Sequence, residues 1–214
     1  MTFPSPRGYD TAMLIVFEGI DGSGKSTVAR SLYEDLYERQ RLVQHITFPS
    51  KRPIGVFLRK CLNGEETINP IAYQHLFIAD ALDNDAQIRT WIDQGNTVIC
   101  DRHPTVSSWV YGIEHFSLPT ILSINVAQLF TRPSLIVVLD VPSEVAAKRL
   151  FERGGMDATY DTVDLSKIEQ RRSRYFATVN LSPLAYAILD GTKSVRALTD
   201  AARGLVDQLS LRQN

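Results

Sequence analysis

The sequence predicts an α/β domain in which a doubly wound, five-stranded parallel sheet is flanked by helices. Two observations predict this fold: short apolar runs alternate with segments of helical periodicity, and a glycine-rich loop follows the first run. Several of the runs are apolar on both faces, as expected for strands that helices cover on both sides. The predicted strands are residues 14–18, 42–47, 97–101, 135–140 and 184–189.

The loop after the first predicted strand has the pattern of a nucleotide phosphate-binding loop, or P-loop. Residues 19–26 fit G-x-x-x-x-G-K-[ST], and residues 28–40 are predicted to form a helix. Glycines let several N–H groups point into one concavity, and the helix N-terminus adds its positive end. Lys25 is expected to reach the outer phosphates, and the Ser26 hydroxyl to bind Mg²⁺. The predicted nucleotide-binding residues are Gly19, Asp21, Gly22, Ser23, Gly24, Lys25, Ser26 and Thr27.

The composition argues against several other classes of protein. The 214 residues are 44% hydrophobic, which suits one packed domain, and 23 basic against 24 acidic residues give a formal net charge of -1. This balance does not favour nucleic acid or a membrane surface as a partner. The two cysteines fit no metal spacing, and no apolar stretch is long enough to span a bilayer. We expect a cytoplasmic protein with a flexible lead-in over residues 1–12 and one domain over 13–214.

Charged side chains follow later strands, at the sheet edge where ligands bind in such folds. Asp101 and Arg102 end the third strand, where a carboxylate can hold Mg²⁺ and a guanidinium can bind phosphate, although a simple salt bridge also fits. Arg149 and Arg153 lie four residues apart, on one face of a helix that precedes a glycine pair. This pattern is typical of a mobile lid, over about 149–164, and also of a solvated basic helix end.

The residues favour a phosphate as the acceptor of the reaction. The chain is too short for a motor and lacks the N-K-x-D of switch GTPases. A nucleoside hydroxyl benefits from a carboxylate base, whereas a nucleoside monophosphate, with a second pKa of about 6, is already largely a dianion. The second strand ends in Phe48 and Pro49, with no carboxylate. Cations that would neutralise the phosphates come instead from Lys25, Arg59, Arg102, Arg149 and Arg153.

Taken together, these residues make the chain resemble the thymidylate kinase family from about residue 13 to the C-terminus. The shared motifs are F-E-G-I-D-G-S-G-K-S-T at 17–27, F-P at 48–49 with Arg59, L-F-I-A-D at 76–80, D-R-H at 101–103, and Arg149 with Arg153. The resemblance implies ATP- and Mg²⁺-dependent phosphoryl transfer to a pyrimidine deoxynucleoside monophosphate, above all dTMP, which becomes dTDP. It also implies a homodimer.

The resemblance further implies the roles of single residues. Phe77 would stack on the pyrimidine ring, although its helical spacing alone favours the core. Arg59 and Arg102 would hold the acceptor phosphate. The implied catalytic residues are Lys25, Arg102, Arg149, Arg153 and Asp21. The implied substrate-binding residues are Phe48, Arg59, Phe77, Arg102, Ser107 and Tyr111. The implied metal-binding residues are Ser26, Asp101 and Asp21.

Three departures from the family pattern affect the expected specificity. Ala81 stands where the family usually has an arginine that donates to thymine O4. Residues 106–112 read V-S-S-W-V-Y-G instead of the usual S-x-x-A-Y-Q-G, and the lid has Asp157 and Ala158 in place of an Asp-Arg pair. Phosphate handling is therefore expected to be intact and base recognition altered. Two alternatives stay open: a kinase for a nonstandard nucleotide or nucleoside, and, because of Ala158, a catalytically weak nucleotide-binding regulator.

Overall fold

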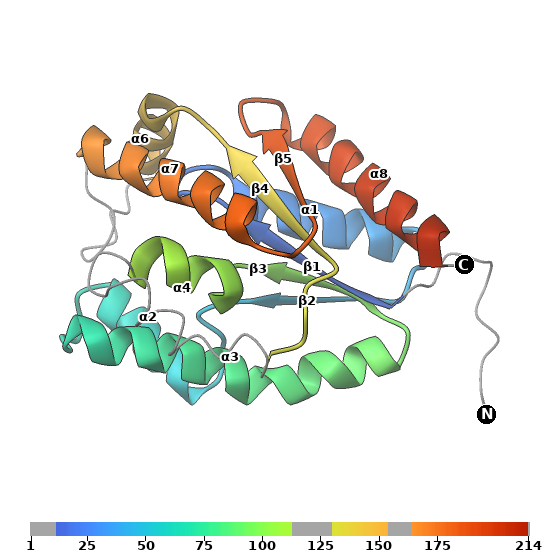
Figure 1. Cartoon of the computed structure of the whole chain (residues 1–214), viewed down its shortest axis with the longest axis horizontal. Helices are drawn as coiled ribbons and strands as arrows, with labels where there is room; N and C mark the ends of the chain where they lie inside the picture. The colour runs from blue at the N-terminus through green and yellow to red at the C-terminus, as the bar shows by residue number, and fades with distance from the viewer. Residues whose placement is uncertain (1–11, 113–129, 154–163, 214) are drawn as a thin grey trace.

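A computed structural model describes residues 12–112, 130–153 and 164–213. Five parallel strands form one sheet in the order β2-β3-β1-β4-β5, with helices on both faces (Figure 1). The strands are β1 (Met13–Glu18), β2 (Val43–Thr47), β3 (Thr97–Asp101), β4 (Leu135–Asp140) and β5 (Tyr186–Asp190). The helices are α1 (Lys25–Glu38), α2 (Pro53–Leu62), α3 (Pro70–Asp93), α4 (Pro104–Gly112), α6 (Ser143–Glu152), α7 (Leu165–Leu181) and α8 (Val195–Gln213). The predicted doubly wound parallel sheet is confirmed.

The strand order places a binding crevice at the carboxyl end of β1. This strand pairs with β3 on one side, where Val16 lies opposite Cys100, and with β4 on the other, where Phe17 lies opposite Val137. The connections therefore wind in opposite directions from β1, and ligands of open α/β sheets bind at such a switch point. The loop that leaves β1 is the predicted P-loop.

Alternate side chains of β1 enter two separate hydrophobic cores. Leu14 and Val16 pack in a core beneath α2, α3, α4 and α7, which includes Ile88 and Tyr175. Ile15 and Phe17 pack in the opposite core, beneath α1 and α8. All six residues of β1 are buried. The central strand is thus fixed from both faces, and the loop after it starts from a rigid support.

The ends of several elements differ from the predicted ones for local reasons. α1 begins at Lys25, not at residue 28, because the Val28 amide already donates to the carbonyl of Gly24 at 3.0 Å. β5 begins at Tyr186, not at 184, because the Leu184 amide donates to Ser182 Oγ at 3.2 Å and so closes the end of α7. The bounds 97–101 and 135–140 are as predicted.

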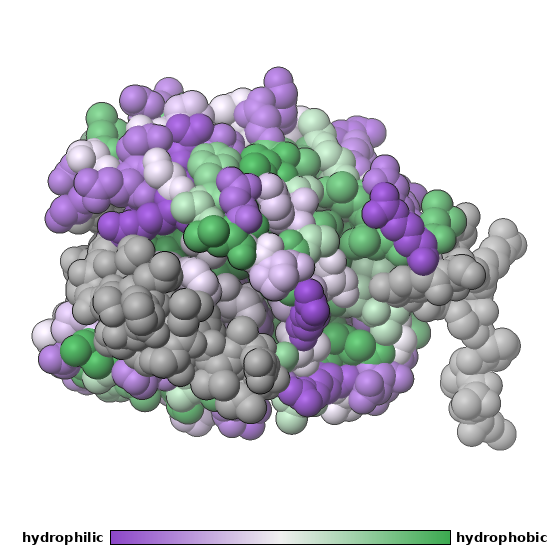
Figure 2. Space-filling model, viewed as in Figure 1, coloured by the Kyte–Doolittle hydropathy of each residue, from purple (hydrophilic) through white to green (hydrophobic). Residues whose placement is uncertain are grey.

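β5 is an edge strand whose two faces differ. Ala187 and Leu189 pack against the core under α8, whereas Tyr186 and Ile188 are exposed. Figure 2 shows apolar side chains gathered on the surface over α7 and β5. Within the described ranges, no helix has the length and apolar character needed to cross a membrane.

Candidate active site

The loop between β1 and α1 has a backbone that only glycine accommodates. Gly19, Gly22 and Gly24 have φ of 144°, 81° and 93°. A Cβ on Gly19 would lie 2.6 Å from the carbonyl oxygen of Leu139, and one on Gly22 would lie 2.5 Å from that of Ala146. The N-cap residue of α1 is Gly24, which has no side chain to bond to the first amides of the helix. The first amides of α1 therefore remain available for an anion.

Lys25 is held inside this loop. Its side chain is buried, and Nζ donates to the Ile20 carbonyl at 3.4 Å and to Asp21 Oδ1 at 3.3 Å. Burial, and then the nearby Arg102 guanidinium, lower the pKa of Lys25. Ser26 and Thr27, the next residues of α1, are exposed at the mouth of the loop. The ammonium group and the helix N-terminus thus face one small region, as phosphate binding requires.

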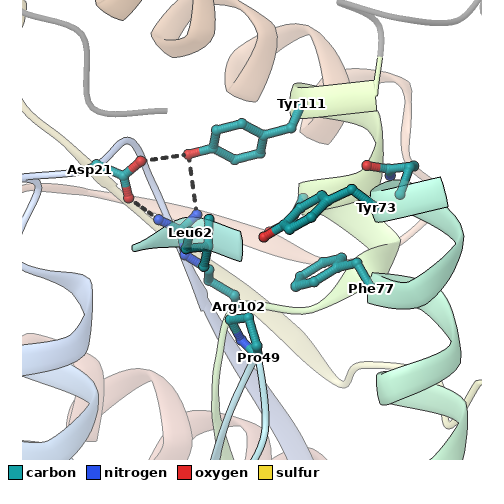
Figure 3. Close-up of a pocket in the computed structure, with 9 residues that line it drawn as sticks. Asp21, Pro49, Leu62, Tyr73, Phe77, Arg102 and Tyr111 are labelled. Atoms are coloured by element: carbon teal, nitrogen blue, oxygen red, sulfur yellow. Dashed lines mark hydrogen bonds and ion pairs between the residues drawn. The ribbon is translucent and has the colours of Figure 1, made fainter. Parts of the chain in front are cut away.

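Asp21, Arg102 and Tyr111 form a closed triangle beside the P-loop (Figure 3). Arg102 Nη2 donates to Asp21 Oδ1, and Arg102 Nη1 donates to the Tyr111 hydroxyl at 3.2 Å. The Tyr111 hydroxyl donates in turn to Asp21 Oδ2 at 3.2 Å. The Arg102 backbone lies in the left-handed region at φ 68°, with its amide bonded to the Phe17 carbonyl at 2.9 Å. Such strain is typical of functional sites.

The protonation states within this triangle follow from burial and charge. Burial raises the pKa of Asp21, but Arg102 and Lys25 outweigh this effect and hold the pKa below its ordinary value. Burial raises the pKa of Tyr111 to about 12. Asp21 is therefore an anion and Tyr111 a neutral hydroxyl at neutral pH.

A second layer of hydrogen bonds supports the triangle from below. Glu18 is fully buried and accepts from the His103 amide at 2.8 Å, from Ser107 Oγ at 2.8 Å and from the Tyr175 hydroxyl at 3.1 Å. Arg102 Nη1 donates to the same Tyr175 hydroxyl at 3.4 Å. Sequence reasoning missed Glu18 and Tyr175 as site residues. The signal for Glu18 was a carboxylate at the end of an otherwise apolar strand.

A pocket opens next to the triangle, between α2, α3 and α4. The space between its walls is about 500 Å³, a volume that includes open solvent. Figure 3 shows Tyr73 and Phe77 of α3 pointing into it, with Asp21 and Tyr111 at its far end. The lining residues are Asp21, Pro49, Leu62, Tyr73, Gln74, Phe77, Arg102, Ser107 and Tyr111. The pocket thus joins an apolar slot to a charged end.

Four of the six predicted substrate-binding residues line the pocket, and the other two, Phe48 and Arg59, do not. Arg102, Ser107 and Tyr111 line the pocket, and Phe77 both lines it and packs in the core. Phe48 is buried in the core beside His103, and its neighbour Pro49 lines the pocket instead. Arg59 is exposed, and its guanidinium donates to the Pro49 carbonyl at the pocket edge.

Arg149 lies against the P-loop. Its Nη1 donates to the carbonyls of Gly22 and Ser23, each at 3.3 Å, and its Nη2 donates to that of Gly191 at 3.0 Å. Arg153 is exposed and caps the C-terminus of α6. Residues 149–152 belong to α6 itself, whereas 154–163 lie outside the described residues. The lid therefore stays a prediction.

Asp101 and Ser26 fit a magnesium site. Asp101 is buried at the end of β3, and among the described residues its Oδ1 has no hydrogen-bond partner. Magnesium in nucleotide sites takes one or two protein oxygens, and phosphates and waters fill its other positions. In the described part of the chain, no cluster of three or more His, Cys, Asp or Glu could hold an ion by itself. The residues present fit a metal that arrives with a nucleotide.

The family model described as Thymidylate kinase matches residues 17–202. The chain belongs to this family. It is 34% identical to the thymidylate kinase of Leptospira borgpetersenii over 165 residues, which cover 76% of this chain and 79% of that protein. It is 29% identical to the thymidylate kinase of Roseiflexus castenholzii over 216 residues, or 92% and 93% of the two chains. A Plasmodium falciparum thymidylate kinase is 30% identical over 164 residues, 76% of each chain.

Within this thymidylate kinase fold, two of the three departures noted in the sequence lie on α3 and α4, which both contribute residues to the pocket, and the third, at Asp157 and Ala158, lies outside the described residues. Ala81 is 1% exposed and packs in the hydrophobic core one helical turn beyond Phe77, so α3 brings no arginine to the pocket there. Residues 106–112 form most of α4. Val106 and Val110 face the core, whereas Ser107 and Tyr111 face the pocket.

Proposed function

We propose that the chain transfers the γ-phosphoryl group of ATP to dTMP, giving dTDP and ADP. The observation that carries this proposal is the position of Arg102, which lies at the inner end of an apolar slot and beside the P-loop aspartate. In this proposal the pyrimidine stacks on Phe77 and the 5′-phosphate is bound by Arg102, because both side chains line the same pocket. Membership of the thymidylate kinase family supports the same substrate.

The reaction needs no protein base. An oxygen of the dTMP phosphate, already ionised at neutral pH, attacks the γ-phosphorus of ATP. The new P–O bond forms as the bond to the β,γ-bridging oxygen breaks, and the electron pair of the broken bond leaves with ADP. Phe48 and Pro49 follow β2, so no carboxylate stands where a hydroxyl-activating base would be needed.

Cations carry the catalysis, because two polyanions must approach each other. Lys25 neutralises charge on the outer phosphates of ATP, and Arg102 holds the acceptor phosphate. Arg149 acts from the other side of the P-loop, where it already binds the Gly22 and Ser23 carbonyls. Arg153 is proposed to join them from the lid over about 149–164.

Mg²⁺ is proposed as the cofactor, held by the Ser26 hydroxyl and, directly or through water, by Asp101 and Asp21. When bound, the ion neutralises charge on the β- and γ-phosphates. The protein's own part is to keep Asp101 buried near Lys25, with an oxygen that has no hydrogen-bond partner among the described residues. We also propose a homodimer, on family resemblance alone, which sedimentation of the full chain would test.

A panel assay tests the proposed function. MgATP-dependent ADP release is measured with dTMP, dUMP, dCMP, dGMP, dAMP and thymidine. We expect dTMP to have the highest kcat/KM and thymidine to give no turnover, because the acceptor must already carry a phosphate. Preference for thymidine would assign the chain to nucleoside kinases, and turnover with none of the monophosphates would favour the regulatory alternative.

A further inference from the structure

Gln74 is a buried amide in the wall of the nucleotide pocket. It lies on α3, one turn before Phe77, and the residue is only 6% exposed although it lines the pocket. Burial of an amide is unfavourable unless its donors and acceptors are satisfied, so a buried glutamine at a pocket wall needs an explanation.

The orientation of this amide is fixed by α4. Gln74 Nε2 donates to the Ser108 backbone carbonyl at 3.2 Å. A carbonyl oxygen only accepts hydrogen bonds, so the nitrogen of the amide must be the atom on that side. The carbonyl oxygen Oε1 accepts no hydrogen bond from the described residues, and the second Nε2 hydrogen also has no acceptor among them. One acceptor and one donor of Gln74 are therefore left for a ligand.

The neighbouring polar groups of the pocket are already committed elsewhere. Asp21, Arg102 and Tyr111 form hydrogen bonds with one another at the charged end of the pocket. Ser107 donates its single hydroxyl proton to Glu18. Ala81, one turn further along α3, brings no polar group. Gln74 is thus placed to supply the base with an acceptor beside a donor.

From this arrangement we propose that Gln74 reads the N3–H edge of a thymine or uracil ring, an assignment that rests on the proposed function. Oε1 accepts from N3–H, and the second Nε2 hydrogen donates to a flanking base carbonyl. Cytosine carries no hydrogen on N3, so its lone pair faces Oε1 and the two acceptors repel. The pocket consequently selects bases with an N3–H without the arginine that the resemblance implies for thymine O4.

The test compares three substrates in two variants of the full chain. Gln74→Met keeps the side-chain length and removes both polar atoms, while Gln87→Met makes the same change at an exposed position of the same helix. kcat/KM with MgATP is measured for dTMP, dUMP and dCMP, and Kd for the same three by calorimetry. dTMP and dUMP share N3–H and differ only at the 5-methyl group.

We expect Gln74→Met to lower kcat/KM for dTMP and dUMP together, by about 10- to 100-fold. The value for dCMP should change less than about threefold, and Gln87→Met should leave all three values at wild-type level. An equal fall for all three substrates would reduce Gln74 to a packing role, and an unchanged dTMP-to-dCMP ratio would overturn the assignment. If the wild-type protein turns over no monophosphate, the proposed function fails. The role of Gln74 is then tested by binding alone: Gln74→Met should weaken binding of dTMP and dUMP relative to dCMP, and an unchanged ratio of the Kd values would overturn the assignment.

Discussion

Arg102 is ion-paired with Asp21, a residue 81 positions away in the sequence, directly at the inner end of the pocket. The cation expected to hold the acceptor phosphate thus already has a carboxylate partner. An incoming phosphate has to share or replace that partner. The pair links the P-loop to the end of β3, which is the point where the proposed mechanism brings the two substrate phosphates together.

Replacing Arg102 by alanine should lower kcat by several powers of ten, because the guanidinium acts on charge that develops in the transition state. Steady-state kinetics with dTMP and MgATP measure the effect. Arg212→Ala, at an exposed position near the end of α8, serves as the control and should retain wild-type kinetics. A loss below tenfold in Arg102→Ala would remove this residue from the catalytic site.

Asp21→Asn should tighten the binding of dTMP in the absence of ATP and Mg²⁺. The substitution frees the Arg102 guanidinium from its carboxylate and removes an anion from the phosphate end, an effect of about 1 kcal/mol or about fivefold in Kd. Titration calorimetry measures it. With MgATP, kcat should fall in the same variant, because the proposed magnesium site loses a carboxylate. Weaker binding of dTMP to Asp21→Asn would contradict this account of the pair.

Gly22→Ala should destabilise the fold and move the P-loop. Its φ of 81° is a backbone angle that alanine rarely adopts. An added Cβ would also lie 2.5 Å from the Ala146 carbonyl oxygen, so there is no space for a methyl group. We expect a loss of about 1–3 kcal/mol in the free energy of unfolding, measured by urea titration. Gly204→Ala is the matched control: it lies within α8, an added Cβ meets nothing within 4 Å, and the change should stabilise by about 0.5–1 kcal/mol. Equal effects at both positions would contradict the steric explanation.

The contact between α1 and α8 should depend on pH through Asp35. Burial raises the pKa of Asp35, but hydrogen bonds from Arg39 at 2.9 Å and Arg203 at 3.1 Å outweigh it and lower the pKa. A lowered folded-state pKa means that the stabilisation is present above the unfolded pKa of about 4 and is lost as the pH falls through the folded value.

Asp35→Asn should therefore cost about 1 kcal/mol of unfolding free energy at pH 7 and nearly nothing at the lowest pH at which the fold persists. Urea titrations at a series of pH values measure the difference. Glu38→Gln, exposed on the same helix, should show no such change. A difference that persists unchanged below pH 3 would rule out the carboxylate as its source.

The sequence was sufficient for the parts of the site that a short motif encodes. The glycines at 19, 22 and 24 take the positive φ angles that the P-loop requires, and Arg102 directly follows the end of β3, as predicted. Family membership and the parallel sheet were likewise predictable. The local pattern was sufficient because the backbone angles of the glycines and the position of Arg102 after a strand are both determined by neighbouring residues in the sequence.

Contacts between distant segments could not be read from the sequence. Glu18 meets Ser107 and Tyr175 across 89 and 157 positions, and Gln74 meets Ser108 across 34. The turn after β2 decides that Pro49, not Phe48, faces the pocket. Such choices depend on packing, which no periodicity encodes.

The most direct test of the central claim is product analysis by chromatography after incubation of the protein with MgATP and dTMP. The account predicts equal amounts of dTDP and ADP from the wild-type protein. It also predicts a rate lower by several powers of ten in Lys25→Ala, which loses the cation of the P-loop. Formation of ADP without dTDP, or dTDP formation that persists at the wild-type rate in Lys25→Ala, would contradict it.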